Sequence, residues 1–198
     1  IKFPAGQEFD YNQTNFWLLN RIFQRVYGQT LDKFILAKQF PTAPASVFFE
    51  SDASSNHSLY SPGYNNTGTS LTKRNWRFPA YNFGAAGLNL SLDEFIRWNQ
   101  QFDKAAFLGA SSIAQLTSPF TYSKPTHFAH GWEIIDILGV KSYGFSGGMT
   151  TAFRKVPDKK LTVILLCNAM LIPGSGKPSL NQVVNHLIEE AENIQAAK

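Results

Sequence analysis

The sequence predicts an α+β fold in which helices flank an antiparallel sheet. Helical periodicity dominates the first part of the chain, strands follow one another from about residue 128, and a helix closes the chain. Short turns separate the strands, and short turns connect antiparallel strands, whereas parallel strands need long crossovers. With 198 residues, of which 43% are hydrophobic and 16% charged, the chain is long enough to bury a core.

Two helices are predicted at the start of the chain. Thr14 or Asn15 can cap the first, and Gly28 ends it in the position that glycine favours after a helix. Thr30 can cap the second, which ends before Pro41. The apolar residues of the first helix recur at helical spacing, which places Phe16, Leu19, Ile22, Phe23 and Val26 on one face.

The middle of the chain combines a polar stretch with two more helices. Residues 41–81 are rich in Ser, Asn, Gly, Thr and Pro, which predicts a long irregular excursion of the kind that often lines a site. Ser91 and Glu94 form a capping box that opens the next helix. A short helix is expected over 111–117 and ends before Pro119.

The last third predicts four strands and a closing helix. The strands are expected at Ala129–Ile137, Lys141–Ser146, Met149–Val156 and Leu161–Cys167. The fourth is wholly apolar, which predicts burial on both of its faces. Ser179–Ala196 is predicted to be the final helix.

Composition excludes several classes of function. The net charge is +4, but Lys and Arg are scattered, so no basic surface indicates nucleic-acid binding. Cys167 is the sole cysteine, which excludes an internal disulfide and a cysteine-rich zinc site. His127 and His130 have no acidic neighbour at metal-ligand spacing, so we expect no metal and no cofactor. The most apolar stretch, Leu161–Ile172, is too short to span a membrane.

Two short motifs carry a resemblance to a known family. The first is Tyr11-Asn12-Gln13, just before a predicted helix, and the second is Tyr143–Gly148, at the end of a predicted strand. Segments 3–6, 85–94 and 161–168 agree in order and spacing. Together they resemble the serine β-lactamase, penicillin-binding protein and related esterase superfamily, whose members carry Ser-x-x-Lys, Tyr-x-Asn and then Lys-Thr-Gly or His-Ser/Thr-Gly.

The resemblance implies acyl transfer through a serine ester and gives roles to particular residues. Tyr11 is expected to relay the serine proton, and the backbone N–H of Gly148 is expected to stabilise the oxyanion. Gln13 takes the place of the family's Asn. The third box is the strand edge beside the substrate, and its members are Phe145, Ser146 and Gly147.

Two departures limit the resemblance. Only ten residues precede Tyr11, so the family's nucleophile motif is expected upstream of Ile1, and the 198-residue chain alone is expected to be inactive. One Ser-x-x-Lys occurs at 70–73, but it follows the Tyr box and lies in the polar stretch. Phe145 replaces the cationic or imidazole position and cannot donate a proton.

We therefore expect one partial β-lactamase-like domain over 1–198, incomplete at its N-terminus. Residues 1–127 are expected to be mainly helix and loop, and residues 128–198 to hold the antiparallel strands and the last helix. The expected function is that of a portion of a serine hydrolase: an esterase, a peptidase or a β-lactam-reactive protein. The alternative is a non-catalytic member that binds peptidoglycan-like or other acyl ligands.

Expected partners are a small or peptide-like acyl substrate and, through the open parts of the fold, the missing N-terminal segment or another copy of the chain. No nucleic acid is expected. The resemblance implies a periplasmic or extracellular location in a bacterium, although the given chain carries no targeting signal.

Overall fold

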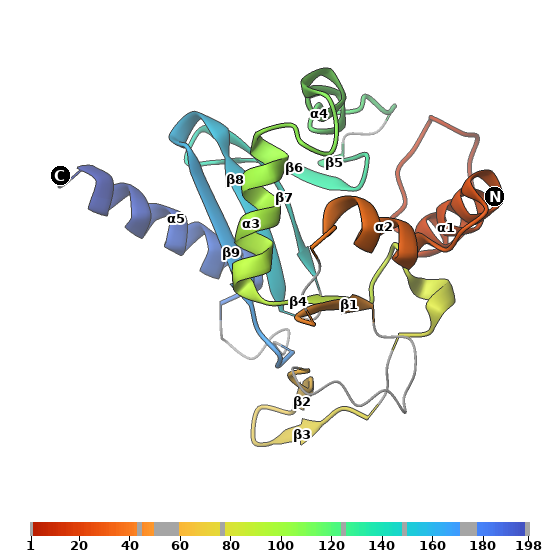
Figure 1. Cartoon of the computed structure of the whole chain (residues 1–198). Coiled ribbons are helices and arrows are strands. Elements are labelled where there is room, and N and C mark those ends of the chain that lie inside the picture. Colours follow the sequence, from red (N-terminus) through yellow and green to blue (C-terminus); the bar gives the residue numbers. More distant parts are fainter. Residues whose placement is uncertain are drawn as a thin grey trace. The chain divides into compact units, whose positions relative to one another are not determined.

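The computed structural model describes residues 2–42, 45–49, 60–75, 78–123, 126–147, 150–170 and 178–196. These residues form the predicted α+β fold (Figure 1). The chain divides into two compact units: Ile1–Phe9, Pro62–Arg74 and Ser111–Lys198 make the first, and Asp10–Ser61 and Asn75–Ala110 make the second. The expectation of one partial domain over 1–198 stays a prediction.

The first unit contains an antiparallel five-stranded sheet with the order β5-β6-β7-β8-β9. Its strands are β5 (Phe128–Ala129), β6 (Trp132–Ile137), β7 (Val140–Gly147), β8 (Thr151–Val156) and β9 (Leu161–Leu166). Neighbouring strands are consecutive in the sequence, because tight turns connect them. Gly139 turns β6 into β7 at φ 76°, and the short helix η2 (Pro157–Lys159) leads into β9.

Helix α5 (Leu180–Ala196) covers one face of this sheet, beside β8 and β9 (Figure 1). Apolar side chains of β6, β8 and β9 alternate toward it, and α5 contributes residues one turn apart, which is the spacing of a single helical face. The resulting core consists of Ile137, Ala152, Val156, Val163, Val184 and Ile188.

Three predictions about the strands need correction. The predicted strand Ala129–Ile137 is two strands, because His130 and Gly131 both adopt positive φ and turn the chain between β5 and β6. The predicted strand from Met149 begins only at Thr151, because Thr150 adopts a positive φ of 58° and its N–H donates to the Gly147 carbonyl in a turn, while 148–149 lie outside the described residues. Burial of β9 on both faces was wrong: only Val163 is buried, and β9 is the last strand in the sheet order.

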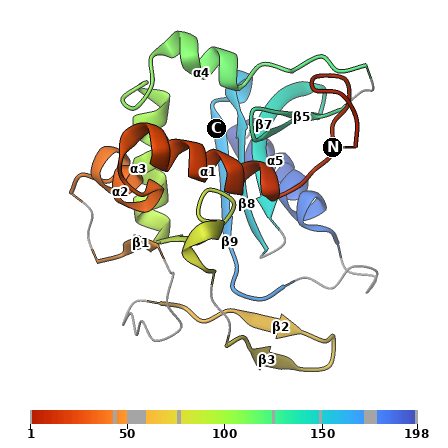
Figure 2. The same ribbon diagram turned by 90° about the vertical axis from the view of Figure 1, so that its right-hand side faces the viewer.

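A small hairpin and a short helix complete the first unit. Strands β2 (Tyr64–Asn66) and β3 (Leu71–Lys73) pair with each other, and Tyr64 N donates to Asn168 O at 2.7 Å just after β9 (Figure 2). Helix α4 (Ala110–Leu116) lies close to its predicted bounds. The predicted irregular excursion therefore contains ordered strands, while 43–44, 50–59 and 76–77 lie outside the described residues.

The second unit packs helices around a two-stranded pair. It contains α1 (Thr14–Tyr27), α2 (Leu31–Gln39), β1 (Val47–Phe49), the short helix η1 (Ala80–Asn82), β4 (Leu88–Leu90) and α3 (Leu92–Asp103). Strands β1 and β4 are antiparallel. The capping box is confirmed, since the Ser91 hydroxyl accepts from the Glu94 N–H at 3.3 Å. Phe23 packs edge-on against Phe34 at 4.8 Å between ring centroids, which joins α1 to α2.

The apolar face of α1 is largely exposed. Phe16 and Phe23 are half-buried, but Leu19, Ile22 and Val26 are each more than half exposed, and α1 has no fully buried residue. Its N-cap is Gln13 rather than Thr14 or Asn15, whereas its end at Gly28, with φ 66°, is confirmed. The periodicity identified the apolar face correctly, but the described residues do not cover that face.

Candidate functional site

The Tyr box lies at the start of α1, where local hydrogen bonds fix the backbone. Asn12 Oδ1 accepts from the Thr14 N–H at 2.9 Å, and the Gln13 carbonyl accepts from the Phe16 and Trp17 N–H groups. The side chain of Tyr11 is 55% exposed. The Tyr11 phenol is therefore accessible to solvent beside the start of α1.

The third box lies at the end of β7, beyond the register of β6. The pairing of β6 with β7 runs from Ile137↔Val140 to Glu133↔Gly144. The pairing of β8 with β7 continues through Phe145, Ser146 and Gly147. These three residues therefore extend past the end of the β6 register while β8 holds them from the other side.

The side chains of this segment alternate between the two faces of the sheet. Phe145 packs toward Phe128, with 6.2 Å between ring centroids. Ser146 lies on the opposite face, in register with Ala152, and its hydroxyl oxygen is buried without a hydrogen-bond partner among the described residues. An unpartnered buried hydroxyl is costly, so a ligand or a further protein group that bonded to it would stabilise the site.

The predicted site residues fall into two groups. Tyr11 and Gln13 belong to the second unit, and Phe145, Ser146 and Gly147 belong to the first. Gly148 lies outside the described residues. That the two boxes share one cleft therefore stays a prediction, as do the roles of all six residues.

The Ser-x-x-Lys at 70–73 is part of the β2–β3 hairpin. The Ser70 hydroxyl lies 2.9 Å from the Thr67 hydroxyl in the turn, and Lys73 ends β3. Residues three apart along an extended chain point to opposite sides, whereas on a helix they share a face. This geometry does not form a Ser–Lys pair, which agrees with the expectation that the nucleophile lies elsewhere.

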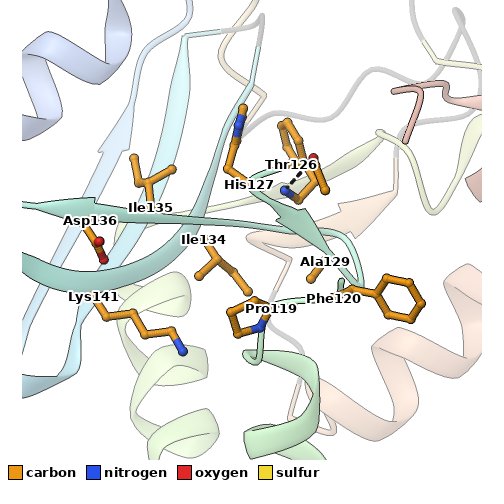
Figure 3. Close-up of a pocket in the computed structure, with 10 residues that line it drawn as sticks. Pro119, Phe120, Thr126, His127, Ala129, Ile134, Ile135, Asp136 and Lys141 are labelled. Atoms are coloured by element: carbon orange, nitrogen blue, oxygen red, sulfur yellow. Dashed lines mark hydrogen bonds between the residues drawn. The ribbon is translucent and has the colours of Figure 1, made fainter. Parts of the chain in front are cut away.

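The first unit also has a cavity of about 260 Å³ along β6, which no sequence motif indicated. It lies between the end of α4 and the β5–β6 hairpin (Figure 3). His127 and Ile135 lie on one side of the β6 ribbon, and Ile134 and Lys141 lie on the other. Phe128 lines the cavity and also packs toward Phe145. Four separate stretches build this cavity, at 119–120, 126–129, 134–136 and 141, so local patterns could not reveal it.

A charged cluster was also missed in the sequence. The Glu133 carboxylate lies 3.6 Å from His127 Nε2 and pairs on its other side with the guanidinium of Arg154. The β5–β6 turn brings His127 and Glu133 together, and the sheet register adds Arg154 from β8. In the described part of the chain, no three His, Cys, Asp or Glu side chains converge as a metal site would need. None of the described helices is long and apolar enough to cross a membrane.

Comparison with known proteins places this geometry in context. The family model described as Beta-lactamase matches residues 1–181. A D-aminopeptidase of Gluconobacter oxydans (strain 621H) is 25% identical over 191 residues, which cover 86% of this chain and 33% of that protein.

Two solved structures share the fold. A penicillin-binding protein from Bacillus halodurans matches with a TM-score of 0.74 at 17% identity, over 95% of this chain and 58% of that one. D-amino acid amidase from Ochrobactrum anthropi SV3, complexed with D-phenylalanine, matches with a TM-score of 0.75 at 13% identity, over 94% of this chain and 59% of that one. The chain thus spans about a third of the curated relative and somewhat more than half of each solved structure.

Proposed function

Because the chain belongs to the Beta-lactamase family, we propose that it is the C-terminal portion of a serine hydrolase that acts by acyl transfer through a serine ester. In this proposal the nucleophile motif is supplied from upstream of residue 1. Tyr11 relays the proton of that serine, and the Gly148 N–H stabilises the oxyanion. Gln13 offers an amide to the substrate.

One observation carries the proposal most directly: the end of β7 continues beyond the β6 register while β8 supports it. A strand edge in this state can align an extended acyl substrate through main-chain hydrogen bonds. Phe145 and Phe128 supply an aromatic wall beside it. These features suit a substrate that combines an amide-like backbone with an apolar side group.

The names of two relatives narrow the proposed substrate class. One is a D-aminopeptidase and the other a D-amino acid amidase complexed with D-phenylalanine. We therefore favour a small amino-acid amide or a short peptide over a simple ester. Esters and β-lactams remain substrates to test, because all three classes present an acyl carbon to a serine.

The alternative function is non-catalytic binding of a peptidoglycan-like or other acyl ligand. Phe145 favours it, because a phenyl ring supplies neither charge nor proton where the family's third box carries a cation or an imidazole. The sequence upstream of residue 1 distinguishes the two, because a Ser-x-x-Lys at a helix start supports the enzyme and its absence supports the binding protein. In a longer version that contains the nucleophile, we expect Phe145→His to raise turnover or leave it unchanged, and a large loss would show that Phe145 packs against the substrate.

We further propose that the N-terminal segment expected upstream, or another copy of the chain, covers the open apolar surfaces. In the second unit these are the exposed residues of α1, and in the first unit they are the outer edge of β9 with Leu166. An apolar strand edge left open to water is an association hazard. Fast hydrogen exchange at Val163–Leu166 that persists both in an upstream-extended chain and in a concentrated sample of this chain would contradict this part of the proposal.

The proposed location is the periplasm or the cell exterior. It follows from the family resemblance alone, and fractionation of the native bacterium would test it.

Turnover assays test the proposed chemistry. The 198-residue chain is expected not to hydrolyse a chromogenic cephalosporin, a nitrophenyl ester or D-phenylalanine amide above background, since the proposed nucleophile lies upstream of it. A version extended upstream is expected to be active and to lose activity in Tyr11→Phe. Turnover by the 198-residue chain that disappears in Ser70→Ala would overturn the proposal and identify Ser70 as the nucleophile.

A further inference from the structure

A buried ion pair crosses the sheet at the position where the β6 register ends. Glu133 on β6 is in register with Gly144 on β7, and Gly144 is in register with Arg154 on β8. Residues in register on neighbouring strands project to the same face, so Glu133 and Arg154 point to one side with glycine between them. Gly144 has no side chain to obstruct the path from Arg154 to Glu133.

Burial and hydrogen bonding show that this contact is a specific one. Arg154 is 1% exposed, and its volume is the largest among the fully buried side chains of the described residues. One guanidinium nitrogen donates to the backbone carbonyl of Glu133 at 2.9 Å, and another donates to the Glu133 carboxylate. Charge-assisted bonds of this kind are the strongest in proteins, and two of them fix direction as well as distance.

Gly144 is required by the same arrangement. A Cβ atom placed at this position would collide with the carbonyl oxygen of Phe153 in β8. A glycine inside a strand has no side chain to pack and therefore adds little to the orientation of its own segment. The contact between Glu133 and Arg154 supplies a connection across β7 that Gly144 itself cannot provide.

We propose that Arg154 and Glu133 are positioning residues for the substrate-binding end of β7. This inference rests on the proposed function, because it concerns the site segment Phe145–Gly147. That segment begins directly after Gly144, the position where Arg154 reaches across β7 to Glu133. It continues beyond the β6 register. The ion pair fixes β6 to β8 at the last shared position, so it sets the direction in which the segment leaves the sheet.

The ion pair also extends toward the cavity. The half-exposed imidazole of His127 lies 3.6 Å from the Glu133 carboxylate and lines the cavity along β6 (Figure 3). Arg154 is fully buried and cannot itself touch a ligand, so it acts through Glu133 and the backbone of β7. This distinguishes a positioning residue from a catalytic one.

The test must separate positioning from stability. Replacing a buried ion pair by apolar residues of similar size is often neutral for stability, whereas removing one partner leaves a buried charge and is strongly destabilising. The double variant Glu133→Leu/Arg154→Met is therefore expected to unfold at a denaturant concentration close to that of the wild type. Amide hydrogen exchange at Phe145, Ser146 and Gly147 is nevertheless expected to be about tenfold faster. Wild-type exchange at these amides in the folded double variant would overturn the proposal.

A second comparison uses conservative variants and decides the question where the double variant does not fold. Glu133→Gln keeps the side-chain length and an oxygen that accepts from the guanidinium, whereas Glu133→Asp keeps the charge but is one methylene too short to reach it. We expect the NMR amide signals of residues 145–147 to stay at their wild-type positions in the Gln variant and to shift in the Asp variant. Equal spectra of the two variants would contradict a positioning role.

The matched control is the partly exposed ion pair of Lys159 with Glu192, at 3.2 Å in the same unit. The variant Lys159→Met/Glu192→Leu is expected to leave the exchange of residues 145–147 unchanged. Neither readout needs turnover, so this inference can fail while the proposed acyl transfer holds, and the reverse is also true.

Discussion

Helices α5 and α1 have similar apolar periodicity, but the apolar face of α5 is buried and that of α1 is exposed. On α5, Val184 and Ile188 are buried against the sheet, and Ile188 is 0% exposed. On α1, Leu19, Ile22 and Val26 recur at the same kind of spacing, yet none of them is buried. Amphipathic periodicity predicts which face of a helix is apolar. It does not predict that the residues which cover that face belong to the same stretch of chain.

The greater length of the relatives offers an explanation for this difference between α5 and α1. The chain covers about 58% of the penicillin-binding protein that it resembles, so much of that fold has no counterpart in these 198 residues. The first unit has closed its core between the sheet and α5. The second unit presents an apolar helix face, which we propose is covered by the upstream segment or another copy.

The largest expected effect on the free energy of unfolding is in the first unit, where α5 packs against the sheet. Ile188→Ala removes a wholly buried side chain from the core between α5 and the sheet. We expect the free energy of unfolding to fall by about 2–4 kcal/mol, because the neighbours cannot fill the cavity completely. Chemical denaturation followed by circular dichroism measures it. A loss below about 0.5 kcal/mol, the level of an ordinary surface substitution, would mean that α5 does not pack against the sheet in solution.

A smaller effect is expected where a local contact stabilises the second unit. Ser91→Ala removes the hydroxyl that caps α3 through the Glu94 N–H. We expect a loss of about 1 kcal/mol in the free energy of unfolding, typical of an N-cap. Ser111→Ala, at an exposed position of α4, is the control and should change stability little. Equal effects of the two substitutions would show that the capping box contributes nothing.

The smallest expected effect on the free energy of unfolding is on the exposed apolar face of α1. Ile22→Ala on α1 shortens a side chain that is 58% exposed. In a dilute monomer we expect a change within about 0.5 kcal/mol, because little apolar surface is lost from contact. The same denaturation experiment as for Ile188→Ala tests it. A loss as large as that of Ile188→Ala would show that α1 is already covered in the isolated chain.

The sequence predicted the elements whose signals are local. The Ser91–Glu94 capping box, the end of α1 at Gly28 and the last helix follow from caps and periodicity, and the structure confirms them. The break between β5 and β6 was missed because His130 adopts a positive φ, which its residue type does not require. The sequence places the apolar residues of α1 on one face but says nothing of its exposure, because burial depends on partners, which periodicity does not report.

Only those residues of the candidate site that belong to short sequence motifs could be predicted from the sequence. Phe145–Gly147 could be placed at a strand end from their neighbours in the chain. The contact between Glu133 and Arg154 could not, because it joins residues 21 apart across an intervening strand and depends on the register of three strands. Once the register is known, Gly144 can be explained, because a residue without a side chain is needed where Arg154 reaches across β7 to Glu133.

The most direct test of the central claim is the intact mass of an upstream-extended version after reaction with a β-lactam or an activated amino-acid ester. The account predicts one acyl adduct per chain, located by peptide mapping on a serine upstream of Ile1, with slower formation in Tyr11→Phe. An adduct on Ser70, or an adduct that forms equally fast without Tyr11, would contradict the assignment of this chain as the C-terminal part of a serine acyl-transfer site.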